Sequence, residues 1–161
     1  MATSGLEICV PTAADGERLL RLARGIALFD AGDVETIEEL WTEFVTKGEK
    51  GWYRFLVARQ GEEIRGFAAY GRRPLTQASF DLYWLGTGQQ FQGQGIGKQL
   101  LRRVEDEVRR LGGKLLIIET SGRPEFEPTR QFYLHAGCEL EARIRDFYAP
   151  GDDLVVFTVH L

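Results

Sequence analysis

Cysteine is scarce in this sequence, which argues against a fold held together by disulfides. The 161 residues include only two cysteines, Cys9 and Cys138, and neither has CxxC spacing or an adjacent histidine. We therefore expect neither a disulfide framework nor a zinc site, and no bound metal of any kind. Both thiols are expected to be buried packing residues.

Long apolar runs and an excess of basic residues are also lacking. No stretch of about 18 uninterrupted apolar residues occurs, and residues 1–10 show no basic region followed by an apolar run. We therefore expect a cytoplasmic protein without membrane association. The 20 Lys and Arg residues against 24 Asp and Glu give a net charge of -4, which disfavours nucleic acid as a partner. The length predicts a single domain spanning residues 1–161.

What the sequence does contain is an alternation of strand-like and helix-like segments. Short β-rich apolar runs predict strands, and apolar residues at helical spacing predict amphipathic helices. The predicted strands cover residues 6–10, 52–59, 64–71, 80–87, 114–119, 139–145 and 154–160. The predicted helices are one that Thr12 or Asp15 caps and that reaches Ile26, and three more at residues 32–45, 96–111 and 128–136. Charges four residues apart on the third helix, including Glu105 with Arg109, predict a solvated outer face.

The most informative stretch is QQFQGQGIGKQLL, residues 89–101, in which three glycines lead directly into a helix. Such a turn presents backbone N–H groups at the positive end of a helix, which favours a phosphate ligand. A dinucleotide fingerprint fails because Lys98 stands where the third glycine belongs, and a P-loop fails at Gln92 and Gln99. The pattern that fits is Q-x-x-G-x-G, from Gln92 to Gly97.

A second motif lies in RQFYLHAGCELEARI, residues 130–144, which contains F-Y-x-x-x-G-C. Together the two motifs make the chain resemble the GNAT superfamily of N-acetyltransferases, and the resemblance covers most of the chain. It implies an α/β (α+β) fold with a central mixed, mostly antiparallel sheet of about seven strands. About four helices flank this sheet, which is splayed between strands four and five. The resemblance also implies acetyl-CoA as co-substrate and transfer of its acetyl group to a primary amine.

The expected cofactor site has two parts. A pyrophosphate needs donors in the absence of a metal, and consecutive amides at the start of the third helix supply them, with glycine allowing a close approach. These residues are Gln92, Gly93, Gln94, Gly95, Ile96, Gly97 and Lys98. The resemblance places the peptide-like pantetheine beside the end of strand four. The segment LGTG there, which supplies Leu85, Gly86 and Thr87, is expected to form a bulge or a strand end, and Gly86 and Gly88 fit a plain turn equally well.

The expected chemistry is attack of a neutral amine on a thioester, followed by protonation of the leaving thiolate. The resemblance assigns the acid to Tyr133, which would otherwise be a core aromatic. Asp81 is the expected base or strand-edge surface residue, with Glu119 as its competitor. His135 and His160 have suitable intrinsic pKa values but are less favoured by position.

The chain departs from the family after strand five. TSGRPEFEP replaces an asparagine-bearing connection, so Thr129 or Ser121 is expected to take over the polar contact to the cofactor. RDFYAPGDD, residues 145–153, is expected to border the acceptor site, where its acids would suit a cationic amine. The alternative to an enzyme is a non-catalytic acyl-CoA-binding sensor. The expected partner is a small-molecule or peptide amine, and the protein is expected to be a monomer or homodimer.

Overall fold

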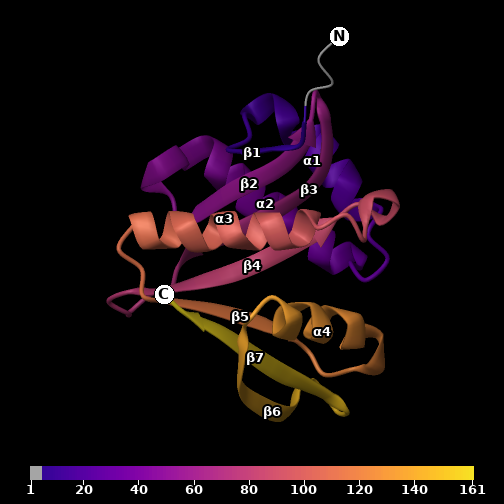
Figure 1. Cartoon of the computed structure of the whole chain (residues 1–161), viewed down its shortest axis with the longest axis vertical. Helices are drawn as coiled ribbons and strands as arrows, with labels where there is room; N and C mark the ends of the chain where they lie inside the picture. Colours follow the sequence, from indigo (N-terminus) through magenta and orange to yellow (C-terminus); the bar gives the residue numbers. More distant parts are fainter. Residues whose placement is uncertain (1–4) are drawn as a thin grey trace.

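The computed structural model describes residues 5–161, which form one seven-stranded mixed sheet with helices on both faces (Figure 1). The sheet order is β1-β2-β3-β4-β5-β7-β6. The strands are β1 Glu7–Cys9, β2 Tyr53–Gln60, β3 Glu63–Arg72, β4 Ser79–Thr87, β5 Leu115–Ser121, β6 Glu139–Ala149 and β7 Asp152–His160. The α-helices are α1 Gly16–Arg24, α2 Ala31–Lys47, α3 Ile96–Arg110 and α4 Glu127–His135. This arrangement confirms the predicted fold class and all eleven predicted elements.

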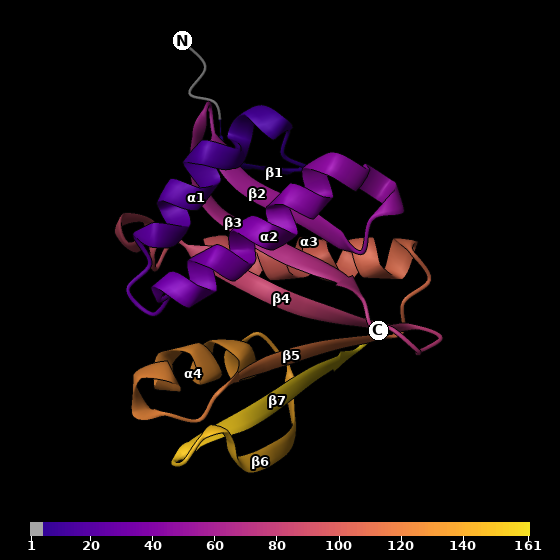
Figure 2. The same cartoon turned by 180° about the vertical axis from the view of Figure 1, so that it is seen from behind.

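Two hydrophobic clusters hold the helices on the sheet. One joins α3 and α4 to the sheet through residues such as Leu101, Ile118 and Phe157. The other packs α1 and α2 against the opposite face of β2 and β3, so these helices lie behind the sheet in Figure 1 and in front of it in Figure 2. Cys138 is buried in the first cluster as expected, but Cys9 is only half-buried. No helix in residues 5–161 has the length and apolar composition needed to cross a bilayer.

The outer face of α3 differs from the expected solvated surface at Glu105. Glu105 is only 2% exposed, and it pairs with Arg102, one turn away, at 3.0 Å. The other nitrogen of Arg102 donates to the backbone oxygen of Ala136 at 2.9 Å, just beyond α4. The predicted pair of Glu105 with Arg109 is therefore wrong, because Glu105 serves a tertiary contact between α3 and the end of α4.

The feature that positions the site is the parting of β4 from β5. These strands pair in parallel only from Ser79 to Leu82 on β4, opposite Leu115 to Ile118 on β5. Both strands continue without pairing to each other, and Figure 2 shows them diverging. The register of β4 on β3 shifts at Tyr83, which is an extra residue between the pairs formed by Leu82 and Trp84. A bulge bends its strand, so β4 turns away from β5 where the pairing ends.

The bulge lies earlier than the sequence pattern indicated. LGTG contains the end of β4, at Thr87, and not the bulge. Gly86 lies inside the strand, where a Cβ atom would come within 2.6 Å of Ile26 and 3.0 Å of Phe67. Gly86 is therefore required for packing of the strand against the residues that follow α1, and the plain-turn alternative is wrong for this residue.

Candidate active site

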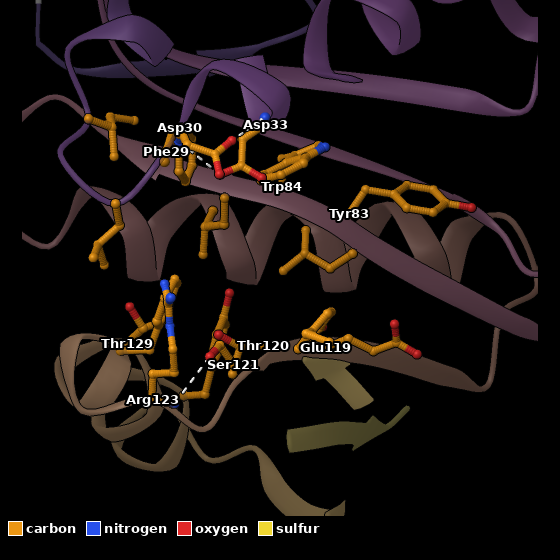
Figure 3. Close-up of a pocket in the computed structure, with 18 of the residues that line it drawn as sticks. Phe29, Asp30, Asp33, Tyr83, Trp84, Glu119, Thr120, Ser121, Arg123 and Thr129 are labelled. Atoms are coloured by element: carbon orange, nitrogen blue, oxygen red, sulfur yellow. Dashed lines mark hydrogen bonds between the residues drawn. The ribbon is translucent and has the colours of Figure 1, made fainter. Parts of the chain in front are cut away.

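A cavity of about 610 Å³ occupies the gap between the parted strands (Figure 3). Figure 3 shows Phe29, Asp30 and Trp84 on one side of the cavity and residues of β5 and the start of α4, including Thr129, on the other. The side chain of Tyr148 and that of Asp152, from the β6–β7 hairpin, complete the lining. Segments from several separate parts of the chain therefore converge on one space.

One end of the gap leads to the glycine turn that begins α3. Gly93 and Gly95 both have a φ of +79°, and a Cβ atom at either would meet nothing within 4 Å. Within residues 5–161, the backbone N–H groups of residues 93–98 donate to no other protein group. Unpaired N–H groups in left-handed turns at a helix N-terminus form an anion site. The turn thus fits a diphosphate.

Gly97 differs from its two neighbours. It has a helical backbone, and its Cβ would lie 3.3 Å from the ring of Phe132 on α4. Its lack of a side chain therefore serves the contact between α3 and α4. Ile96 is 2% exposed, with its side chain in the core, so it offers only its backbone N–H to the turn.

The other predicted cofactor residues lie along the cavity. Its lining includes Leu85, Gly86, Thr87, Gln92 and Thr129. By contrast, the predicted residues at the turn lie outside the lining: Gly93, Gln94, Gly95, Ile96, Gly97 and Lys98. Past Leu82, the edge of β4 that faces the gap has no partner strand. This edge offers free backbone groups to a peptide-like ligand.

The two hydroxyls considered for the missing asparagine have different surroundings. Ser121 donates a short hydrogen bond to Asp152 and accepts one from the backbone N–H of Arg123 at 3.1 Å. Thr129 lines the cavity and has no side-chain hydrogen bond within the described part of the chain. Of the two, Thr129 has the hydroxyl available for a ligand.

Tyr133 projects from α4 into the floor of the cavity. It is 6% exposed and packs against the rings of Phe132 and Phe157. Burial raises the pKa of Tyr133 well above its ordinary value, and Cys138 adds to the effect. The phenol therefore keeps its proton at neutral pH, which is the state that a proton donor requires.

The two carboxylates considered as bases both lie at the closed end of the gap. Asp81 is 5% exposed, and its Oδ1 accepts a hydrogen bond from Arg73 Nη1 at 3.0 Å. Burial raises the pKa of Asp81, and Arg73 together with the Tyr83 phenol offsets only part of that effect. Glu119 is more exposed and lies 3.8 Å from the same Arg73 nitrogen.

The two histidines, His135 and His160, lie outside the cavity. His135 is exposed on α4 and His160 is exposed at the end of β7, and neither lines the cavity. The side chain of His160 instead lies close to Glu139 and Glu141 on β6. These positions agree with the expectation that neither histidine is the preferred base.

Several lining residues were not found from the sequence. Arg73 follows β3 directly, and Phe29, Asp30 and Asp33 lie between α1 and the first turn of α2. Trp84 meets Phe29 edge to face at 5.3 Å, because the bulge turns its side chain toward α1 and α2. No local pattern marks these residues, whereas the segment 145–153 was noticed and does supply Tyr148 and Asp152.

Known proteins resemble this chain in sequence and in fold. The sequence model described as "Acetyltransferase (GNAT) domain" matches residues 51–138. A crystal structure from Desulfovibrio desulfuricans, assigned to the GNAT family of acetyltransferases, is 32% identical with a TM-score of 0.94, covering 97% of this chain and 99% of that one. None of the curated proteins matches the sequence.

More distant structures share the fold. Salmonella typhimurium YncA, solved with its cofactor acetyl-CoA, is 18% identical with a TM-score of 0.77, covering 98% of this chain and 95% of that one. The ribosomal-protein-S18-alanine N-acetyltransferase of Escherichia coli is 17% identical with a TM-score of 0.77, covering 97% and 94%. With a family match over more than half of its length and a close relative along almost all of it, this chain belongs to the GNAT family of acetyltransferases.

Proposed function

We propose that the protein is an acetyl-CoA-dependent N-acetyltransferase that acts on a primary amine. The observation that carries this proposal is the arrangement along one gap: an anion-binding turn at one end, and a protonated phenol and two carboxylates on the walls. Acetyl-CoA supplies the acetyl group as a thioester. The solved structure of YncA with acetyl-CoA supports this choice of co-substrate.

The cofactor is held by backbone groups in this proposal. The N–H groups of residues 93–98 bind the pyrophosphate, and glycine at 93 and 95 permits the turn. The free edge of β4 from Leu85 to Thr87 binds the pantetheine, and Thr129 provides a hydroxyl from the opposite wall. This arrangement directs the thioester toward the closed end of the gap.

Two side chains move the protons. An amine must be neutral to attack, so Asp81 accepts its proton directly or through a water molecule. As the new C–N bond forms and the C–S bond breaks, Tyr133 donates its proton to the leaving sulfur. Glu119 is the second candidate for the base, since it faces the same space.

The lining favours a cationic acceptor. Five carboxylates line the cavity, against two guanidinium groups: Asp30, Asp33, Asp81, Glu119 and Asp152, against Arg73 and Arg123. Such a surplus attracts an ammonium group before it loses its proton. Aromatic rings at the same wall, such as that of Trp84, add a favourable surface for a cation.

The test is release of CoA from acetyl-CoA in the presence of an amine panel. The panel contains polyamines, amino acids, aminoglycosides, lysine peptides and a peptide beginning with alanine, as in the E. coli relative. Turnover with at least one amine, confirmed by mass spectrometry of an N-acetyl product, is the expected result. Tight acetyl-CoA binding without turnover on any amine would favour the alternative, a non-catalytic acyl-CoA-binding sensor.

A further inference from the structure

One cation lies between the two carboxylates at the point where the sheet opens. Arg73 Nη1 is 3.0 Å from Asp81 Oδ1 on β4 and 3.8 Å from Glu119 Oε1 on β5. The last paired residues of these strands are Leu82 and Ile118. Arg73 therefore spans the two strands at the closed end of the cavity, although it comes from the connection that follows β3.

The surroundings of Asp81 leave Arg73 as its main stabilising charge. The phenol of Tyr83 on β4 is the other polar group that favours the ionised carboxylate. The ring of Tyr53 on β2 packs edge to face on Tyr83, at 5.4 Å, and Tyr148 on β6 lies near Glu119. Burial raises the pKa of Tyr83 and that of Tyr148, so both phenols are uncharged at neutral pH.

Burial works against the function proposed for Asp81. A carboxyl that is 5% exposed is disfavoured in its charged form, and a protonated carboxyl cannot accept a proton from an amine. An opposite charge within hydrogen-bond distance counteracts burial. In the described part of the chain, Arg73 is the cation that acts on Asp81 in this way.

We propose that Arg73 is a positioning residue that keeps Asp81 ionised and holds it together with Glu119 at the closed end of the cavity. Arg73 itself is 46% exposed, so its own charge remains partly hydrated while it neutralises the buried partner. When Asp81 takes a proton from the acceptor, Glu119 still gives the guanidinium an anionic neighbour. Glu119 thus has a part in the site even where Asp81 is the base.

The ionisation of Asp81 can be measured without any turnover. With ¹³C-labelled aspartate, the carboxyl resonance of Asp81 is identified by its loss in Asp81→Asn, and its titration is followed by NMR. In Arg73→Gln the midpoint moves upward by about one pH unit or more, the lower end of the effect of an adjacent opposite charge. Arg73→Lys, which keeps the charge, restores most of the wild-type midpoint.

Arg72 is the matched control. It is adjacent in sequence, but its guanidinium donates to the backbone oxygen of Leu111 at 2.8 Å and does not line the cavity. Arg72→Gln leaves the Asp81 midpoint unchanged. Arg73→Met is a second neutral variant should Arg73→Gln fold poorly. An Asp81 midpoint equal to that of the wild type in a folded neutral variant overturns the proposal.

The role in catalysis rests on the proposed function and has a separate measurement. With an accepted amine, the acidic limb of the kcat/KM profile moves to higher pH in Arg73→Gln, and activity below that limb falls about tenfold for each pH unit by which the limb moves. A limb that stays in place while the NMR midpoint moves shows that Asp81 is not the base. A wild type that acetylates no amine refutes the proposed function, while the NMR titration still decides the role of Arg73.

Discussion

Replacing Tyr133 by Phe tests the proposed acid with little other disturbance. The Tyr133 hydroxyl makes no hydrogen bond with the described residues, and its ring keeps its contacts with Phe132 and Phe157 in the variant. Because no internal hydrogen bond is lost, the free energy of unfolding should change by less than about 1 kcal/mol. For a chain of this length, that corresponds to less than about 4 °C in Tm.

The effect on turnover should be far larger. A general acid contributes about 10²- to 10⁴-fold to the rate, or roughly 3 to 5 kcal/mol in the activation barrier. Because the hydroxyl acts only as the thiolate leaves, the loss should appear in kcat, with acetyl-CoA affinity nearly unchanged. Burial raises the pKa of Tyr133, and an acid acts in its protonated form, so the wild type should keep this contribution throughout the neutral range.

The assay is CoA release at saturating amine, with calorimetric titration of acetyl-CoA and a thermal melt on the same samples. Tyr70→Phe is the matched control, because Tyr70 is equally buried on β3 but does not line the cavity. It should retain full turnover. If Tyr133→Phe also keeps full turnover with every accepted amine, the proton comes from another group, and Tyr133 is a core aromatic only.

Three further changes probe the turn, the base and the core. Gly95→Asp should weaken acetyl-CoA binding at least about tenfold in calorimetry, because the new carboxylate repels the pyrophosphate. Gly61 also has a positive φ and open space around it, so Gly61→Asp is the control and should leave the affinity unchanged. Equal affinities of the two variants would show that the turn is not part of the site. Asp81→Asn should lower neutral-pH turnover without lowering Tm. Because burial raises the pKa of Asp81, ionisation of this carboxyl destabilises the native state. As the pH falls and Asp81 is protonated, the Tm of the wild type should therefore rise relative to that of the variant. A lower Tm for the variant at neutral pH would contradict this. Asp15 pairs with Arg59 at 2.7 Å and its pKa is lowered, since this ion pair and the hydrogen bond from the backbone N–H of Thr12 outweigh burial. Asp15→Asn should therefore lower the free energy of unfolding by roughly 3 kcal/mol at neutral pH, measured with denaturant. This difference should shrink in acid, where the wild-type carboxylate is protonated. An equal difference at all pH values would refute the ion pair as its source.

The sequence by itself determined the helices, the strands and the glycine turn before α3. Apolar spacing, cap residues and turn residues are all local, so the order of seven strands and four helices followed from these patterns. The glycine-rich turn was readable for the same reason, since glycines that lead directly into a helix are a local pattern, but only the structure shows that Gly93 and Gly95 have a positive φ while Gly97 has a helical backbone. The predicted helix over residues 128–136 likewise contains Tyr133, and the structure has this helix at Glu127–His135.

Only the tertiary structure decided where β4 bends and which side chains meet in the gap. The bulge at Tyr83 depends on how β4 registers against β3, and nothing in the local sequence distinguishes it from the LGTG segment that follows. Glu105, in a helix of alternating charges, is buried because the end of α4 covers it. Arg73 becomes part of the site because β3, β4 and β5 bring it between Asp81 and Glu119. Arg73 and Glu119 are 46 positions apart in the chain. Long-range packing of this kind is set by the whole sheet, and a spacing pattern within one segment carries no record of it.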